Sequence, residues 1–332
     1  MTTNTLKKNR GLQITNTIAN NKAIIILLFL WIVMSFASKN FLSGTNLINI
    51  VKQCCVSTVI SLGMTIAISS GNMDLSVGTL LGLSGIVMAL LSRDLHLPTG
   101  VVIAAGLGVG ALGGLLNGVI YTQFKLNPFI VTLATQNIFA GVGYILCGNK
   151  AVNGLSEAFI FLGQGKLLGI PMLIVIMAVC LAIVAVMMYK TKIGRQIVAV
   201  GGNREAARVS GINVKHVGIL VYLFTGLCAG VSAVMLTART AAASTTGGAG
   251  MEMDAICAVV LGGTSLAGGK ANVFGTLLGC LIVGTITNGL TLLRVDSNWQ
   301  VVAKGIIIIL AVVIDVETER LTAKRALAAM DK

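Results

Sequence analysis

The chain alternates long apolar runs with short polar connections, and this pattern predicts helices that span a membrane. A helix of about 20 mostly apolar residues crosses a bilayer, and shorter or broken segments are tolerated where protein surrounds them. On that basis we expect about ten segments. They are residues 23–38, 53–70, 75–92, 101–122, 129–148, 171–189, 217–238, 252–266, 271–293 and 301–316. The sequence therefore predicts an all-α, polytopic integral membrane protein with some broken or short helices.

Two places in this pattern are irregular. The segment 252–266 is short for a full crossing, begins with Glu252 and Asp254, and ends in a glycine-rich turn. The polar stretch 69–78 interrupts two apolar runs. Irregular backbone at membrane depth is tolerated only where it is buried in protein or lines a water-filled cavity. Both places are therefore predicted to belong to a transport pathway.

Composition supports the membrane assignment and excludes nucleic acid as a partner. Of the 332 residues 55% are hydrophobic and 11% are charged, with a mean hydropathy of +0.92, far more apolar than a soluble domain. The net charge of +13 comes from basic residues that flank apolar runs, and aromatic residues make up only 5%. With the N-terminus inside, 16 of the 24 basic residues fall on cytoplasmic pieces.

The domain division follows from this topology, with both termini in the cytoplasm. We expect a cytoplasmic N-terminal segment at 1–22, a transmembrane domain at 23–316 and a cytoplasmic tail at 317–332. The only long polar loop between spans, 190–216, is then also cytoplasmic.

Catalytic, metal and cofactor sites are not expected. Seven cysteines occur without a CxxC pair, and the chain has only two histidines. The GxGxxG pattern at 108–113 lies inside an apolar run and is better described as a ladder for close helix packing. That ladder consists of Gly106, Gly110, Gly114 and Gly118. The stretch 263–271 resembles a phosphate loop but has Thr264 and Ala271 where the motif needs glycine and a hydroxyl residue.

The polar loop 190–216 is predicted to contain a short helix outside the bilayer. Asn203 can cap it, Glu205 in its first turn suits the helix dipole, and Gly211 can end it. One interpretation is a basic loop that anchors the topology. The other is a rigid knob that docks into a partner.

Three motifs resemble the ribose-type permeases of ATP-binding cassette importers. Residues 194–195 and 201–212 resemble the family's coupling loop. Residues 71–78 are similar to its Gly-Gly-Ile-Asp-Leu-Ser-Val-Gly motif, and residues 262–269 match a further pattern. The motifs fall in order over nearly the whole chain. The departures are Asn72 and Met73 for the usual glycine and isoleucine, and Ala271 where glycine is common.

The resemblance implies a transport subunit of the bacterial inner membrane, embedded in lipid, that imports a ribose-like monosaccharide by alternating access. It implies a second permease subunit, usually an identical one, a cytoplasmic ATPase that hydrolyses the ATP, and an extracytoplasmic sugar-binding protein. No cofactor is implied. The residues expected to contact the ATPase are Arg195, Asn203, Glu205, Ala206, Ala207, Arg208 and Gly211.

Polar residues within the apolar segments are the candidates for the pathway and its gates. They are Asn72, Asp74, Ser76, Asn117 and Asn288. Asp74 is expected to cap the following helix, near Ser76 and Val77, or to contact sugar, and both roles can coexist. Glu252 and Asp254 are expected to cap a half-helix or to line the outer mouth.

Two other functions stay open at this point. An ion- or proton-coupled secondary transporter of a small polar solute would need no ATPase, but it ordinarily places several charged residues in mid-span. A membrane scaffold or membrane enzyme is disfavoured because no constellation of catalytic residues is present.

Overall fold

The computed structural model of the protein describes residues 22–296, 298–307, 309–310 and 313. Its helices are α2 (Lys22–Ala37), α3 (Gly44–Ser69), α4 (Val77–Asp94), α5 (Thr99–Phe124), α6 (Pro128–Cys147), α7 (Glu157–Gln164), α8 (Met172–Lys190), α9 (Lys192–Gly202), α10 (Arg204–Val209), α11 (Val214–Thr240), α12 (Met251–Leu261) and α13 (Val273–Leu292). Strands β1 (Lys166–Leu167) and β2 (Ile170–Pro171) form a small antiparallel hairpin. The predicted all-α class is confirmed.

Among the described helices, seven are long and apolar enough to cross a membrane: α3, α4, α5, α6, α8, α11 and α13. Residues 23–37 of α2 form a shorter apolar helix. The largest boundary error concerns α3, which begins at Gly44 and not near residue 53. Its first turns mix apolar residues with Thr45, Asn46, Asn49 and Lys52, which breaks the apolar run. The Ser43 hydroxyl caps this start by accepting from the Asn46 N–H at 3.3 Å.

The predicted broken helix is confirmed in α12, which has only 11 residues. A non-helical segment, residues 241–250, leads from the end of α11 to its start, and Gly250 there has a φ of 81°. Of the predicted span 301–316, residues 301–307, 309–310 and 313 are described and helical. Of the predicted N-terminal segment 1–22, residues 1–21 lie outside the described residues and Lys22 begins α2, and the predicted tail 317–332 lies outside the described residues.

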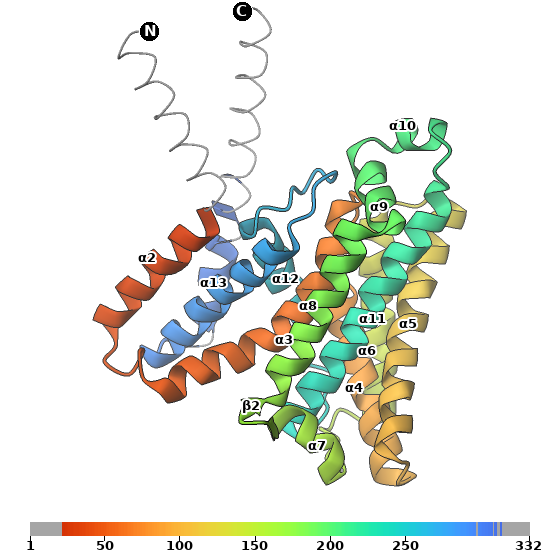
Figure 1. Cartoon of the computed structure of the whole chain (residues 1–332). Coiled ribbons are helices and arrows are strands. Elements are labelled where there is room, and N and C mark those ends of the chain that lie inside the picture. Colours follow the sequence, from red (N-terminus) through yellow and green to blue (C-terminus); the bar gives the residue numbers. More distant parts are fainter. Residues whose placement is uncertain (1–21, 297, 308, 311–312, 314–332) are drawn as a thin grey trace, which may run out of the picture.

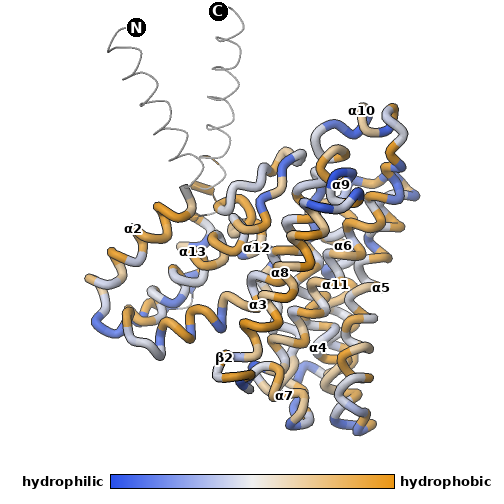
Figure 2. The backbone as a smooth tube through the Cα atoms, in the orientation of Figure 1, coloured by the Kyte–Doolittle hydropathy of each residue, from blue (hydrophilic) through white to orange (hydrophobic). Residues whose placement is uncertain are grey.

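Polar and apolar elements are separated along the long axis of the bundle. The short helices α9 and α10 lie at one end, and α7 with the β-hairpin lies at the other (Figure 1). Figure 2 shows hydrophilic positions gathered at these two ends and mostly apolar helices between them. This arrangement fits a protein whose middle lies in hydrocarbon.

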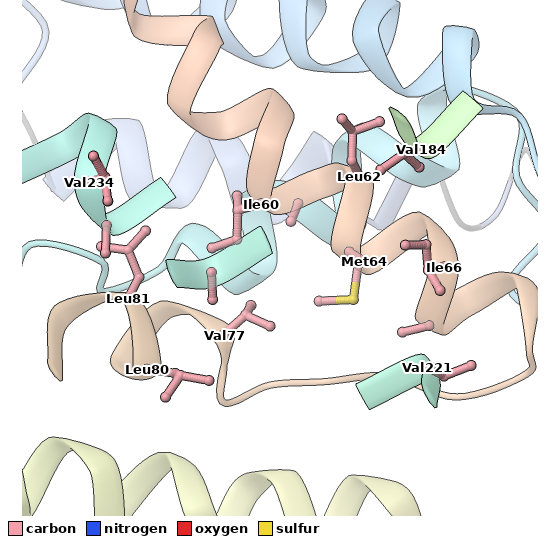
Figure 3. Packing of buried hydrophobic residues seen from close by; sticks show 14 of the residues in the cluster. Ile60, Leu62, Met64, Ile66, Val77, Leu80, Leu81, Val184, Val221 and Val234 are labelled. Carbon is pink, nitrogen blue, oxygen red and sulfur yellow. The ribbon is translucent and has the colours of Figure 1, made fainter. Parts of the chain in front are cut away.

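Helix α11 runs through the centre of the bundle and packs closely against α5. Apolar side chains from α3, α4, α8 and α11 meet in the core (Figure 3). The predicted glycine ladder is confirmed: Gly110 and Gly114 face the backbone of α11 at Gly226, and Gly118 faces Ile219. Gly106 instead faces the Met88 side chain of α4. Small residues allow this backbone approach between membrane helices.

Candidate functional site

The polar loop 190–216 folds into two helices at one end of the bundle. The Asn203 side-chain oxygen accepts from the Ala206 N–H at 2.9 Å, which confirms the predicted cap of α10. Helix α9 was not predicted, because the stretch was interpreted as loop. Its signal was present in Ile193, Ile197 and Val200, which recur at helical spacing and face the protein interior.

The residues predicted to contact an ATPase gather on this unit, and most are open to solvent. Exposed residues are Arg195, Asn203, Glu205, Ala206, Arg208 and Gly211, whereas Ala207 is buried. Glu205 and Arg208 form an exposed salt bridge at 2.8 Å. Gly211, with a φ of 84°, lets the Ile212 N–H reach the Ala207 carbonyl at 3.0 Å and end the helix.

The interrupted segment 70–76 buries a carboxylate between two spans. Asp74 is fully buried, and its Oδ1 accepts from the Ser76 N–H at 2.9 Å and the Ser76 hydroxyl at 2.6 Å. The Asn117 amide of α5 donates to the Ser76 oxygen at 2.8 Å. The predicted hydrogen bond from the Ser76 N–H is present, but Ser76 precedes the first residue of α4, and no hydrogen bond to Val77 accompanies it in the described chain. Asp74 therefore holds the turn that leads into α4. Asn72 turns away and donates to the Ser70 hydroxyl at 2.8 Å.

Asn288 does not join this group. Its amide forms a reciprocal pair with Asn46 of α3, with distances of 3.0 and 2.9 Å. Asn46 donates in addition to the Phe41 carbonyl at 2.9 Å. Asn288 therefore ties α13 to the start of α3, and its suggested place in the pathway stays a prediction.

Glu252 and Asp254 both lie in the first turn of α12, as expected for acidic residues at a helix start. Glu252 is buried where Gly78, at the start of α4, leaves room for its carboxylate. Asp254 forms a salt bridge with Lys304 at 2.8 Å. Their suggested place at the outer mouth stays a prediction.

Five glycines bring three separate segments into backbone contact, and we call them the glycine junction. They are Gly71, Gly201, Gly202, Gly268 and Gly269. A Cβ atom at Gly268 would lie 2.8 Å from the Gly201 carbonyl oxygen and 2.9 Å from the Gly71 nitrogen. The Gly269 N–H donates to the Ser69 carbonyl at 3.0 Å. The last turn of α9 therefore touches the breaks after α3 and after α12.

A second connection runs through two tyrosines. The Arg204 guanidinium of α10 donates to the Tyr121 hydroxyl and lies 5.3 Å from the centre of its ring. The rings of Tyr121 and Tyr222 pack edge to face at 5.7 Å. The Tyr222 hydroxyl donates to the Met73 carbonyl at 3.1 Å. Helix α10 is thus linked by direct contacts to the segment that holds Asp74.

Sequence reasoning missed the tyrosines and the two α9 glycines as parts of the site. The chain has only four tyrosines among few aromatic residues, so two polar rings near helix ends were a usable signal. The five glycines of the junction lie within the motifs 71–78, 201–212 and 262–269, but their contact could not be predicted, because these segments lie far apart in the chain.

Fold and site together define a class: a multi-pass helical membrane protein in which an exposed helical loop is tied to two interrupted spans. Residues 46–312 match the family described as the permease component of the branched-chain amino acid transport system. The chain belongs to this permease family.

Several relatives resemble the chain over most of their length. The ribose import permease protein RbsC of Escherichia coli K12 is 42% identical over 298 residues, which cover 89% of this chain and 92% of the relative. RbsC of Bacillus subtilis 168 is 41% identical, with 87% and 90% covered. The D-allose transport system permease protein AlsC of Escherichia coli K12 is 37% identical, with 88% and 89% covered.

Proposed function

We propose that the chain is the membrane-spanning permease subunit of an ATP-binding cassette importer that carries a monosaccharide inward. The names of similar proteins, which cover ribose import and D-allose and xylose transport, support a sugar as the cargo. The chain forms the pathway, and a partner ATPase hydrolyses the ATP.

The observation that carries this proposal is the unit formed by α9 and α10. It is polar and exposed on one side, and on the other it contacts both interrupted segments through the glycine junction. A helical unit with two such faces can receive a push from a docked partner and pass it to the membrane segments. Rigid elements and packed contacts of this kind are the physical means of coupling.

Two further elements of the proposal concern orientation and partners. The end of the bundle that carries α10 faces the cytoplasm, so both termini lie inside. The opposite end, with α7 and the hairpin, faces a sugar-binding protein outside. A second copy of the chain completes the pathway in the inner membrane. The excess of basic residues on the proposed cytoplasmic pieces supports this orientation.

The contacts also suggest how the motion travels. Movement of α10 acts on Arg204, passes through Tyr121 and Tyr222 to the Met73 carbonyl, and shifts the segment that buries Asp74. The glycine junction carries the same movement to the turn after α12. The two interrupted segments thus respond together.

An ion- or proton-coupled secondary transporter is the weaker alternative. The relatives' names speak of import and transport permeases. Among the described residues, charges within the bundle are few, and Asp254 is neutralised by Lys304.

Uptake by a reconstituted complex tests the proposal. The chain is placed in proteoliposomes with a partner ATPase and a sugar-binding protein, and labelled D-ribose, D-allose and D-xylose are offered with ATP inside or outside. We expect uptake of at least one sugar that requires ATP on the α10 side. Uptake that follows an ion gradient without ATP would contradict the proposal.

A further inference from the structure

The described residues enclose a sizeable cavity beside the non-helical segment 241–250, at the end of the bundle opposite α10. Its volume is about 330 Å³, and its walls come from α4, α11, this segment and the connection after α6. Small-molecule sites occupy roughly 300 to 1,000 Å³. The cavity opens to the surface at its rim, where Thr240 and Gly247 are exposed.

Glycines on α4 make the room for this cavity. A Cβ atom at Gly85 would lie 2.6 Å from the Thr237 hydroxyl oxygen, and one at Gly82 would lie 3.1 Å from the Thr245 carbonyl oxygen. Larger residues at these positions would cover polar groups of the wall. The glycines therefore let α4 lie close to Thr237 and Thr245 without covering their oxygen atoms.

The wall offers donors and acceptors that suit hydroxyl groups. Thr237, Thr240 and Ser244 line it, and so does Arg239, whose guanidinium donates to the Lys52 carbonyl of α3 at 3.5 Å. The Thr240 hydroxyl donates to the Leu236 carbonyl at 2.9 Å and the Ala242 carbonyl at 2.8 Å, so toward a ligand it can only accept. In the described chain the Thr237 and Ser244 hydroxyls form no hydrogen bond. These two hydroxyls can both donate to and accept from a ligand.

We infer that this cavity, which we call the re-entrant cavity, holds the monosaccharide on its way through the protein. The inference rests on the proposed function and adds the place of the ligand. Sugar hydroxyls both donate and accept hydrogen bonds, as the Thr237 and Ser244 hydroxyls require, and they can donate to the Thr240 oxygen. Non-helical backbone within a bundle is tolerated where it lines such a cavity. The cavity lies on the side proposed to receive sugar from outside.

The first test fills the cavity. Ala242 lines it, so Ala242→Trp in the reconstituted complex should lower D-ribose uptake by about tenfold or more while the complex still assembles. Ala104→Trp, at an exposed position of α5 outside the cavity, is the matched control and should keep uptake. Wild-type uptake by an assembled Ala242→Trp complex would overturn the inference.

The second test does not depend on that variant folding. In a complex whose seven native cysteines are replaced, Ser244→Cys should react with a small hydrophilic thiol reagent, and D-ribose should slow the reaction. Thr246→Cys is exposed and outside the lining, so its labelling should not respond to D-ribose. Protection of Ser244→Cys by inorganic phosphate but not by D-ribose, or by neither, would overturn the inference. If the unaltered complex takes up no sugar, the proposed function itself fails.

Discussion

At the scale of single residues, one oxygen of the buried Asp74 carboxylate is held by short-range hydrogen bonds, and the other has no partner among the described residues. The Asp74 carboxylate is fully buried and satisfies both the N–H and the hydroxyl of Ser76. A buried donor that loses its acceptor costs about 1 to 3 kcal/mol. Asp74 therefore stabilises the interrupted segment, whatever else it does during transport.

Replacing Asp74 tests this. Asp74→Ala should lower the free energy of unfolding of the protein in detergent by about 1 to 3 kcal/mol. Asp74→Asn keeps an acceptor oxygen and should lower this free energy clearly less. Asp94→Ala, at the exposed end of α4, serves as a control and should change little. Equal stability for Asp74→Ala and the wild type would contradict the stabilising role of Asp74.

The tyrosine contacts lead to a second prediction at this scale. Tyr121→Phe keeps the ring that packs against Tyr222 but removes the hydroxyl that accepts from Arg204. We expect near-normal stability and ATP hydrolysis with fewer sugars transported per ATP. Measuring both rates in one proteoliposome preparation gives this ratio, and an unchanged ratio would remove the tyrosines from the coupling route.

Local bonds were predictable from sequence, and distant ones were not. Asp74 and Asn203 accept from N–H groups two or three positions away, so residue type and spacing were sufficient. Asn288 pairs with Asn46, 242 residues earlier in the chain, and no local pattern announces such a partner. From the sequence alone, the suggested pathway role of Asn288 could therefore not be compared with its actual contact to Asn46.

At the scale of elements, most membrane spans could be predicted from the apolar runs, because length and hydropathy decide membrane insertion. Periodicity could not show that α12 is preceded by the non-helical segment 241–250, since neither half of that crossing is long enough to give a pattern. Polar residues in the first turns of α3 hid its start, because they interrupt the apolar run.

The glycine ladder gives an element-scale prediction. A methyl group at Gly114 would collide with the Tyr222 carbonyl of α11, whereas Gly108 on the same helix has open space. Gly114→Ala should therefore separate the two helices and lower the melting temperature in detergent, and Gly108→Ala should not. If both variants have the same melting temperature as the wild type, the close approach of α5 and α11 is wrong.

At the scale of the whole molecule, the two polar ends give the protein a direction. The α10 end bears the proposed ATPase contact, and the opposite end opens the re-entrant cavity. A reporter of accessibility at position 203 should react with a reagent only on the cytoplasmic side of the membrane, and not from outside intact cells. Modification from outside would reverse the proposed topology and with it the assignment of every loop.

We propose that α10 transmits work from a partner ATPase to the membrane segments, and replacing the salt bridge of α10 tests this proposal. Glu205 and Arg208 are exposed and bond to each other, so changing both to alanine should leave folding and membrane insertion intact. In proteoliposomes with the full complex, we expect that ATP-driven sugar uptake is lost and that sugar no longer stimulates ATP hydrolysis. Unchanged uptake together with unchanged stimulation in this double variant would contradict it.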